Sequence, residues 1–300
     1  MEGAILTAIL DRLGGALASS PFDTRGWAPR VPWPQCTRSV RQDMYALRVD
    51  GVAFGYVDAA RAARLERFDD VFRVGHDTVE FVAALADAPS RTAAMAGVAR
   101  ALAREGALSA WRHELYAVSE YFGAAPTFLL ERAAARYFGI HTFAAHVNGV
   151  VATPDGPMLW FARRSQTKPI DPGQLDNLVG GGIAAGRSIA DTVVKEAWEE
   201  AGIDAALAAT ARPAGSLYVE RLHPDGLQRE TIFVHDLELP AHFVPANQDG
   251  EAIEHRLVAL AEAARLIAAT AGPGVVTIDA SVVVLDYLVR CGAFGGQAPR

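Results

Sequence analysis

Three glutamates near residue 200 are spaced so that they share one face of a helix. Glu196, Glu199 and Glu200 are three and four residues apart, and side chains at this spacing are neighbours on a helix surface. Carboxylates this close repel each other, and a divalent cation removes the repulsion. Carboxylate oxygens are ligands that suit Mg²⁺ or Mn²⁺. The same spacing also fits an exposed acidic face, so the three glutamates alone leave both interpretations open.

The sequence around these glutamates supplies the elements that would position them. A run of three glycines at residues 180–182 precedes the segment, and Gly202 follows it. Ser188 and Asp191 have the spacing of a helix N-cap and its capping-box partner. Gly202 fits the left-handed residue that ends many helices. The sequence therefore predicts a short capped helix that carries all three glutamates and starts just after a glycine-rich turn.

The segment from Gly181 to Ile203 resembles the Nudix box, whose pattern is G-x5-E-x7-R-E-U-x-E-E-x-G-U with U a bulky aliphatic residue. Aligning Gly202 and Ile203 with the last two positions brings the three helix glutamates onto the glutamates of the box. Two positions depart from the pattern, because Arg187 stands at the first glutamate and Lys195 stands at the arginine. The resemblance implies a Nudix α/β/α sandwich with a mixed β-sheet. It also implies Mg²⁺-dependent hydrolysis of a diphosphate linkage, with Mn²⁺ as an alternative ion.

The resemblance also implies roles for individual carboxylates. The three helix glutamates would bind the metal, and a backbone carbonyl near Gly180 would complete its shell. A further carboxylate commonly serves as general base in such enzymes. We expect this role for Glu199 or Glu200 on the helix, or for Glu251 in a later Asp-Gly-Glu turn, with Glu254 in reserve. The turn sequence by itself fits an ordinary surface turn equally well.

Basic and aromatic side chains near the box are candidates for holding the substrate. Arg163, Arg164 and Lys168 precede the box and are predicted to bind the diphosphate, although each also fits an exposed surface charge. Arg187 is predicted to offer its guanidinium to a substrate phosphate, or else to lower the number of bound metal ions. Tyr218 is a candidate to stack on a substrate ring, although a tyrosine on a strand more often packs in a core. Lys195 keeps the charge of the arginine it replaces but lacks its bidentate fork.

The composition excludes several other classes of protein. A net charge of −7 argues against nucleic-acid binding through a basic face. No apolar run reaches the length of a membrane-spanning helix, and the first thirteen residues predict an amphipathic surface helix rather than a signal peptide. Cys36 and Cys291 form no CxxC pair, which argues against a structural zinc site and fits a reducing cytoplasm. We expect a cytoplasmic enzyme that acts on a small-molecule diphosphate, with a homodimer as one form of assembly.

The chain is expected to divide into two domains and a tail. Residues 1–137 would form an α+β N-terminal domain, residues 138–294 the Nudix domain, and residues 295–300 the tail. In the first domain we expect an irregular connector over residues 20–40 and a β-hairpin over 44–57, with its turn at Asp50-Gly51. Two alanine-rich helices are expected over 57–68 and 78–105, a strand over 111–118 and a last helix over 126–137. In the second domain, residues 149–152 and 158–162 predict two short strands joined by a turn.

Motifs outside the box are similar to one Nudix subgroup, whose relatives occur beside fungal thiamine pyrophosphokinase. They include residues 111–116, 138–149 and 245–251, and the resemblance extends over most of the chain from about residue 45 to 290. Members of this subgroup are thought to cleave thiamine diphosphate, or damaged oxidised forms of it, to the monophosphate. The resemblance therefore implies a thiamine diphosphate-like substrate and an N-terminal domain that covers the cleft. No residue spacing identifies the ring of the substrate.

Three other functions stay open at this point. Arg187 and Lys195 are consistent with a Nudix-fold module that binds a diphosphate without cleaving it. A hydrolase of nucleoside diphosphate-linked compounds, such as nucleotide sugars or coenzyme A, fits the same box. An isomerase of the isopentenyl diphosphate type uses the same fold, but its chemistry requires a cysteine in the cleft. Neither Cys36 nor Cys291 lies near the box in sequence.

Overall fold

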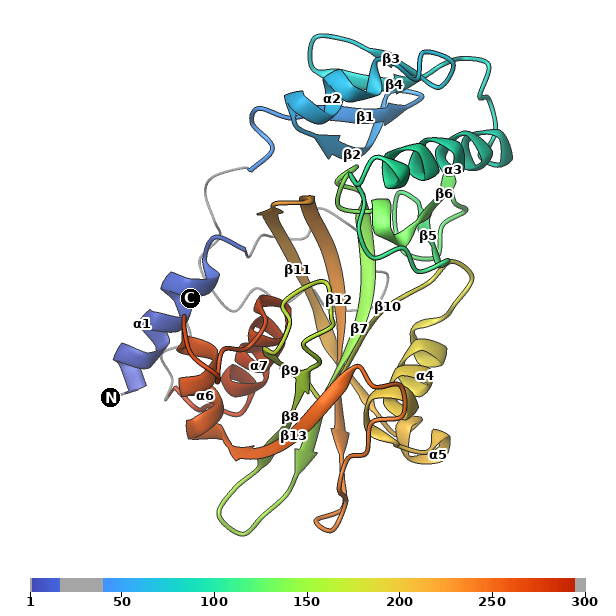
Figure 1. The fold of residues 1–300 in the computed structure, drawn as a ribbon. Helices are drawn as coiled ribbons and strands as arrows, with labels where there is room; N and C mark the ends of the chain where they lie inside the picture. Colours follow the sequence, from blue (N-terminus) through green and yellow to red (C-terminus); the bar gives the residue numbers. More distant parts are fainter. Residues whose placement is uncertain (1, 17–39, 295–300) are drawn as a thin grey trace.

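The computed structural model describes residues 2–16 and 40–294. The connector expected over residues 20–40 therefore lies almost entirely outside the described residues, as do Cys36 and the tail at 295–300. Figure 1 shows the N-terminal domain at the top of the view and a larger C-terminal domain below it, with the upper ends of its long strands towards the N-terminal domain.

The N-terminal domain is built on a four-stranded sheet and a separate two-stranded sheet. The strand order in the larger sheet is β2-β1-β4-β3, and β5 pairs with β6. Its elements are β1 (Tyr45–Val49), β2 (Val52–Val57), α2 (Ala59–Leu65), β3 (Phe72–Val74), β4 (Thr78–Phe81), α3 (Ala88–Arg104), β5 (Leu115–Val118), β6 (Phe128–Glu131) and the 3₁₀ helix η1 (Arg132–Ala134). Side chains from both sheets and both helices share one apolar core, which includes Leu47, Met95, Phe128 and Phe138.

The structure confirms the hairpin and corrects two of the expected helices. Asp50 and Gly51 both have positive φ angles, of 49° and 81°, which suits a two-residue hairpin turn. Residues 78–81 form strand β4, and the helix that follows begins only at Ala88. Residues 126–137 form β6 and η1 instead of a helix. In both places the pairing of strands in a buried sheet outweighs the helix propensity of the local sequence.

The C-terminal domain contains a seven-stranded mixed sheet. The strand order is β11-β12-β7-β8-β13, with β10 paired to β7 and β9 paired to β8. β7 runs parallel to β12 and antiparallel to β8 and β10. The strands are β7 (His141–Val151), β8 (Met158–Arg164), β9 (Leu175–Asn177), β10 (Val179–Gly182), β11 (Arg212–His223), β12 (Gly226–Glu238) and β13 (Ala252–Ala259).

Helices cover both faces of this sheet (Figure 1). One face packs against α4 (Ile189–Ala201) and α5 (Ala205–Ala208), and the other against α1 (Glu2–Leu13), α6 (Leu260–Ala268) and α7 (Ile278–Arg290). Consecutive residues of β7 point to opposite faces, so Phe143 and Ala145 join the α4 core while Ala144 joins the α1, α6 and α7 core. The structure therefore confirms an N-terminal α+β region followed by a Nudix-type α/β/α sandwich with a mixed sheet.

Helix α1 belongs to the core of the C-terminal domain although it precedes the N-terminal domain in sequence. Ile9 and Leu13 are fully buried in that core. The guanidinium of Arg12 donates hydrogen bonds to the carbonyl of Ile267, at 2.6 Å, and to Ser281 Oγ, at 3.1 Å. The expected boundary at residue 137 lies close to the start of the second sheet at His141, but α1 packs with the second domain.

The length and apolar character of the helices decide whether any of them could cross a membrane. The 17 residues of α3 form a helix that is half-exposed and rich in alanine. No helix within residues 2–16 and 40–294 is both long and apolar enough to cross a bilayer.

Candidate active site

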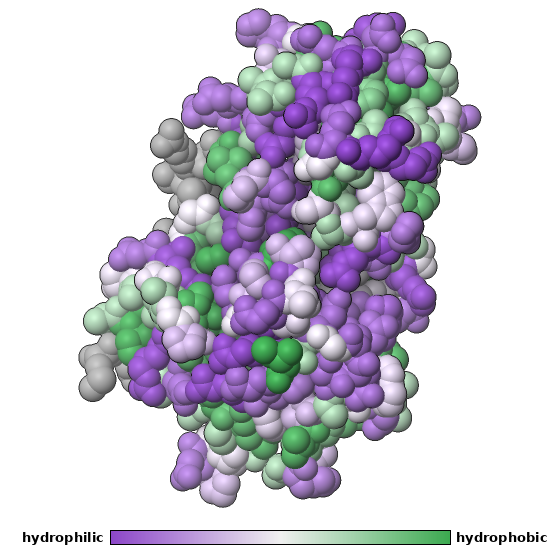
Figure 2. Space-filling model, viewed as in Figure 1, coloured by the Kyte–Doolittle hydropathy of each residue, from purple (hydrophilic) through white to green (hydrophobic). Residues whose placement is uncertain are grey.

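A cavity of about 380 Å³ lies between the N-terminal domain and the sheet of the C-terminal domain. The N-terminal domain contributes β5, η1 and the segment before β5, and the C-terminal domain contributes β7, β8, β9, β10, β12, α4, α7 and the loops at 168–171 and 249–251. Most of the side chains in its wall are charged or polar. The hydrophilic surface continues across the region where the two domains meet (Figure 2). The expectation that the N-terminal domain covers the cleft agrees with this placement.

Helix α4 is held at both ends by the caps that the sequence predicts. Ser188 Oγ accepts a 3.0 Å hydrogen bond from the amide of Asp191, and the Asp191 carboxylate accepts in return from the amide of Ser188. Gly202 has a φ of 65°, the left-handed conformation expected at the helix end. Val193 and Ala197 are buried against the sheet, and this leaves the three glutamates of the helix facing the cavity.

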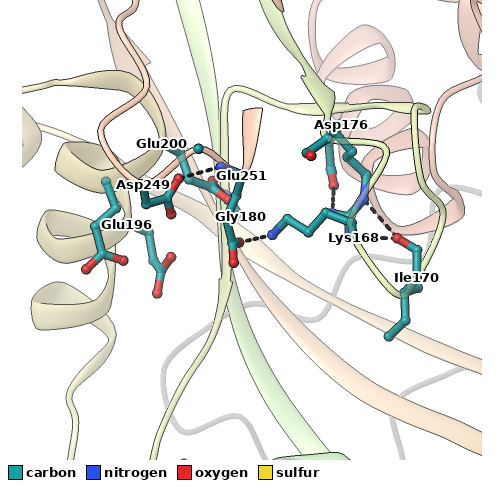
Figure 3. A network of polar contacts seen from close by, with 12 residues as sticks. Lys168, Ile170, Asp176, Gly180, Glu196, Glu200, Asp249 and Glu251 are labelled. Carbon is teal, nitrogen blue, oxygen red and sulfur yellow. Dashed lines mark hydrogen bonds and ion pairs between the residues drawn. The ribbon is translucent and has the colours of Figure 1, made fainter. Parts of the chain in front are cut away.

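Glu200 is the most deeply placed of the three glutamates. Its Oε2 atom accepts a 2.8 Å hydrogen bond from the backbone amide of Gly180 on β10 (Figure 3). Burial raises the pKa of the Glu200 carboxyl to about 8, and the charge of Glu196 adds to this effect. Gly180 was predicted to offer its carbonyl to a metal, and the structure places its amide against one of the predicted metal ligands.

The three glycines of β10 allow the close approach of other groups. A Cβ atom on Gly181 would lie 2.4 Å from the carboxyl carbon of Glu196, and a Cβ on Gly180 would lie 3.0 Å from the ring of His146. A Cβ on Gly182 would lie 1.9 Å from the Tyr116 hydroxyl. The opening glycine of the box pattern therefore has a physical role, because it leaves room for the Glu196 carboxylate above the strand.

Lys195 holds two of the glutamates. Its Nζ atom lies 2.6 Å from Glu199 Oε2 and 3.0 Å from Glu196 Oε1. Partial burial opposes the lysine charge, but the hydrogen bonds to Glu199 and Glu196 outweigh burial and raise the pKa of Lys195. Among the described residues, no three acidic, histidine or cysteine side chains converge closely enough to hold a metal ion in this arrangement. The glutamates thus share one cavity, with a lysine between two of them.

The loop between β12 and β13 brings two more carboxylates to the cavity. The amides of Ala246 and Gln248 donate to the carbonyls of Ala201, at 3.0 Å, and Glu199, at 2.7 Å, so the loop is fastened to the end of α4. Asp249 and Glu251 follow directly and line the cavity. Glu251, predicted from its Asp-Gly-Glu turn, therefore lies in the same cavity as the helix glutamates.

Arg164 lines the cavity, and so does a second predicted basic substrate ligand, Lys168. Its Nζ atom is hydrogen bonded to Glu251 (Figure 3), which also accepts a 3.0 Å bond from Arg112 of the N-terminal domain. Burial lowers the pKa of Lys168. Substrate phosphate at this position would compete with Glu251 for both cations.

Three other predicted substrate ligands lie outside the residues that line the cavity. Arg163 donates to the carbonyls of Gly173 and Pro273 and pairs with Glu254, the reserve candidate for the general base. Arg187 is exposed in the turn before α4. Tyr218 is 3% exposed, and its hydroxyl donates a 2.7 Å bond to Glu220. The structure places Tyr218 in the buried interior of the domain.

The cavity contains further side chains that the sequence reasoning did not select. Asp176 lines the cavity and pairs at 2.6 Å with Arg164, which was predicted to bind the diphosphate. Asp249 belongs to the same turn as Glu251, so that turn was the signal for it. Arg112 and Arg132 come from the N-terminal domain, and no local pattern marks them because they reach the cavity only through domain packing.

Comparisons with known proteins agree with this geometry. Residues 142–277 match the NUDIX domain family, and residues 31–142 match a domain of unknown function, DUF4743. Nudix hydrolase 24, chloroplastic, of Arabidopsis thaliana is 35% identical over 284 residues, which cover 92% of this chain and 76% of that protein. Nudix hydrolase 20, chloroplastic, of the same plant is 37% identical over 249 residues, which cover 79% of this chain and 65% of that protein.

A solved protein from Deinococcus radiodurans, DR0079, superposes with a TM-score of 0.42 and 21% identity, over 58% of this chain and 98% of its own. Both plant relatives carry the word chloroplastic in their names, so the cytoplasmic location stays a prediction. The box on α4, the family match that begins in β7, and the relatives that share both domains lead to one conclusion. The chain belongs to the Nudix hydrolase family, as an enzyme with a DUF4743 region ahead of its Nudix domain.

Proposed function

We propose that this Nudix hydrolase cleaves thiamine diphosphate, or an oxidised derivative, to the monophosphate and inorganic phosphate with the help of Mg²⁺. The observation that carries the proposal is the meeting of the box glutamates, Glu251 and Lys168 in one cavity between the two domains. The resemblance of residues 111–116 and 245–251 to the thiamine-related subgroup supports the choice of substrate, since both segments contribute to this cavity.

The donor chemistry of the cavity suits a divalent ion, and enzymes of this family generally use one. Glu196, Glu199 and Glu200 would hold it through carboxylate oxygens, the ligands that Mg²⁺ and Mn²⁺ prefer. The raised pKa of Glu200 marks a carboxylate that a nearby cation would stabilise. For an ion to bind there, the ammonium of Lys195 would have to move away from Glu199 and Glu196, with which it is now paired. A bound ion supplies neutralisation of phosphate charge and a more acidic water.

Basic residues on the other side of the cavity would bind the diphosphate. Lys168 and Arg112 are now paired with Glu251, and Arg132 is paired with Glu114 at 2.7 Å. Phosphate oxygens form stronger contacts with such donors than a single carboxylate does, because they accept several charge-assisted hydrogen bonds at once. Binding of substrate would therefore draw Lys168 and Arg112 to the phosphate and release Glu251.

The released Glu251 is then a candidate to accept a proton from the attacking water, as is Glu199. The water oxygen forms a bond to one phosphorus, the bond from that phosphorus to the bridging oxygen breaks, and the bridging oxygen leaves with the electron pair. The products are the monophosphate and inorganic phosphate. The positions of Lys168 and Arg112 would orient the reacting phosphorus and screen its negative oxygens from the incoming water.

Product analysis with the full chain tests the proposal. Thiamine diphosphate, an oxidised thiamine diphosphate and a nucleoside diphosphate sugar are each incubated with Mg²⁺, with Mn²⁺ and with a chelator, and products are separated by chromatography. We expect thiamine monophosphate and phosphate, at a kcat/KM at least about tenfold above that for the nucleotide sugar, and none in chelator. A preference for the nucleotide sugar would overturn the substrate assignment, and unchanged turnover in chelator would overturn the role of the metal.

A further inference from the structure

The cavity contains a second pair of carboxylates that the proposed hydrolysis does not use. Glu230 on β12 and Asp279 in the first turn of α7 both line the cavity. The amide nitrogen of Gln228 donates to both of them, at 3.3 Å to Glu230 Oε2 and at 3.0 Å to Asp279 Oδ2. The two carboxylates are therefore neighbours, bridged by one amide group.

Sheet geometry separates this pair from the box glutamates. Glu230 is paired with Thr142 across one edge of β7, whereas Gly180 is paired with His146 across the other edge. Neighbouring strands are about 4.8 Å apart and residues rise about 3.3 Å along a strand. The backbone of Glu230 thus lies about 16 Å from that of Gly180, measured two strands across and four residues along. Gly180 and Glu230 mark opposite ends of one cavity.

One atom of the pair has no hydrogen-bond donor. Both oxygens of Glu230 are engaged, because Oε1 accepts a 2.8 Å bond from the Thr142 hydroxyl and Oε2 accepts from Gln228. Asp279 Oδ2 also accepts from Gln228, but Oδ1 is buried and finds no donor among the described residues. A buried acceptor without a partner is costly, so an unpaired acceptor in a cavity wall suits a ligand that brings a hydrogen-bond donor.

The charged groups around the pair already have other partners. Arg136 faces Asp225 at 3.6 Å, and Arg221 faces Asp171 at 3.8 Å while its Nε atom donates to the side-chain oxygen of Gln228. Burial opposes ionisation of Asp279, but the charge of Arg221 and the bond from Gln228 outweigh burial and lower its pKa. Burial and the nearby Asp279 charge raise the pKa of Glu230. Asp279 therefore keeps a charged carboxylate at the cavity wall, and its Oδ1 atom is not hydrogen bonded to any described residue.

This end of the cavity combines apolar side chains with polar and charged ones, which include Thr142, Arg136 and Asp225. The apolar part consists of three side chains that line the cavity near Glu230. Leu227 lies on the same strand, β12, Ala144 lies on the neighbouring strand β7, and Ile140 directly precedes β7. Apolar side chains beside carboxylate acceptors accommodate a ring that carries an amino group or a positive charge, because the ring packs on the apolar atoms and its donors reach the carboxylates. A diphosphate held at the box glutamates directs the organic part of the same molecule towards this end.

We propose that Asp279 and Glu230 form the subsite for the cationic or amino-bearing ring of the diphosphate substrate and set the preference of the enzyme for such substrates. This inference rests on the proposed function, because it assumes that the diphosphate occupies the end with the box glutamates. In a thiamine-type substrate the amino-substituted ring supplies the missing donor to Asp279 Oδ1. Glu230, held by Thr142 and Gln228, fixes the position of the pair.

Two diphosphates that differ in the ring provide the test. Thiamine diphosphate carries positive charge and an amino group, and phenylethyl diphosphate carries neither. For Asp279→Asn and for Glu230→Gln we expect the KM for thiamine diphosphate to rise about tenfold or more, since a charge-assisted contact is lost. The KM for phenylethyl diphosphate and both kcat values stay within about twofold. Glu238→Gln is the matched control, because Glu238 lies on the same strand and its side chain is 69% exposed.

The outcomes separate this inference from the proposed function. If the wild type hydrolyses both compounds with the same kcat/KM, or both variants keep the wild-type ratio between them, the subsite is overturned while diphosphate hydrolysis stands. If the wild type hydrolyses neither, the proposed function fails, and calorimetry with free thiamine, which has no phosphate, decides the subsite. Tenfold weaker thiamine binding by Asp279→Asn or Glu230→Gln supports it, and equal binding overturns it. Thermal unfolding identifies any variant that does not fold. In that case the ratio of the wild-type kcat/KM values for thiamine diphosphate and phenylethyl diphosphate decides whether the subsite exists.

Discussion

The backbone amide of Gly180 donates a 2.8 Å hydrogen bond to Glu200, a carboxyl whose pKa burial raises to about 8. Gly180 is the first of the three glycines on β10, and Glu200 is the last of the three box glutamates on α4. This contact joins the strand to the helix at the deepest point of the acidic end of the cavity. It also places a carboxylate where its ionisation is costly, unless a cation is present.

Replacement of Glu200 by glutamine should therefore stabilise the metal-free protein while it abolishes activity. Below about pH 4.5 the carboxyl is protonated in both states, and between pH 4.5 and 8 the folded state keeps a proton that the unfolded state has released. Wild-type stability from this group thus falls as the pH rises through that window. Glutamine keeps the shape and the acceptor for Gly180 but does not titrate. We expect the Tm of Glu200→Gln to gain on that of the wild type from pH 5 to 8, in chelator.

Adding Mg²⁺ at pH 8 should raise the Tm of the wild type above that of Glu200→Gln, since only the wild type binds the ion. Turnover of the variant should fall by about a hundredfold or more, as for loss of a metal-site group. Scanning calorimetry at several pH values, with and without Mg²⁺, measures the difference in Tm between Glu200→Gln and the wild type. Glu238→Gln is the control. A difference in Tm that is the same at pH 5 and pH 8 would show that Glu200 does not titrate as described.

Lys168 and Arg163 offer a second comparison, since both were expected to bind substrate and only Lys168 lines the cavity. Lys168→Met should raise the KM for the diphosphate about tenfold, because a charged donor to phosphate is lost. Arg163→Met should leave KM within about twofold but lower the Tm, because the side chain bonds two carbonyls and Glu254. Steady-state kinetics and thermal unfolding on both variants check this. A larger rise in KM for Arg163→Met than for Lys168→Met would refute the assignment.

Lys195 should control the affinity for the metal. Its ammonium lies between Glu199 and Glu196, so it competes with a divalent ion for both carboxylates. In Lys195→Met the repulsion between these glutamates is no longer screened, and a cation relieves it. We expect the Mg²⁺ concentration for half-maximal activity to fall severalfold, with Lys195→Arg close to the wild type. Titration of activity with Mg²⁺ measures this, and a half-maximal concentration that rises in Lys195→Met would contradict it.

The part of the site that the sequence predicts is the part held by local chemistry. Helix α4 has its capping box at Ser188, its left-handed end at Gly202 and its glutamates on one face, and all of these follow from residues within one segment. Glu251 was also found, through its turn, but its position depends on the bonds that fasten residues 246–248 to the end of α4.

What the sequence could not predict depends on contacts between distant segments. Residues 78–81 are a strand because they pair with β1, about thirty residues earlier, and α1 packs with a domain that begins far downstream. Arg163 and Arg164 are adjacent on β8, so their side chains point to opposite faces, and only Arg164 lines the cavity. The local sequence does not determine which of two neighbouring arginines faces the cavity. That depends on how β8 pairs with the strands on either side of it.

The contact between Gly182 and Tyr116 gives a test of the domain arrangement. Tyr116 is a buried residue on β5 of the N-terminal domain, and the neighbouring carbonyl of Leu115 accepts a 2.7 Å bond from the amide of Ala185, just after β10. A Cβ atom on Gly182 would lie 1.9 Å from the Tyr116 hydroxyl and 2.9 Å from its ring. Gly182→Ala should therefore force the N-terminal domain away from β10, with a lower Tm and a weaker kcat/KM for the diphosphate.

Removing the hydroxyl should recover part of this loss, because the closest clash disappears. We expect Gly182→Ala to destabilise the Tyr116→Phe protein by less than it destabilises the wild type, with a coupling of about 0.5–3 kcal/mol between the two positions. Gly97→Ala serves as the control, since Gly97 is exposed on α3 and a Cβ there meets nothing within 4 Å. Denaturant unfolding of the four proteins in the cycle gives the coupling. Strict additivity would mean that β5 and β10 do not meet in solution, and that the N-terminal domain does not form a wall of the cavity.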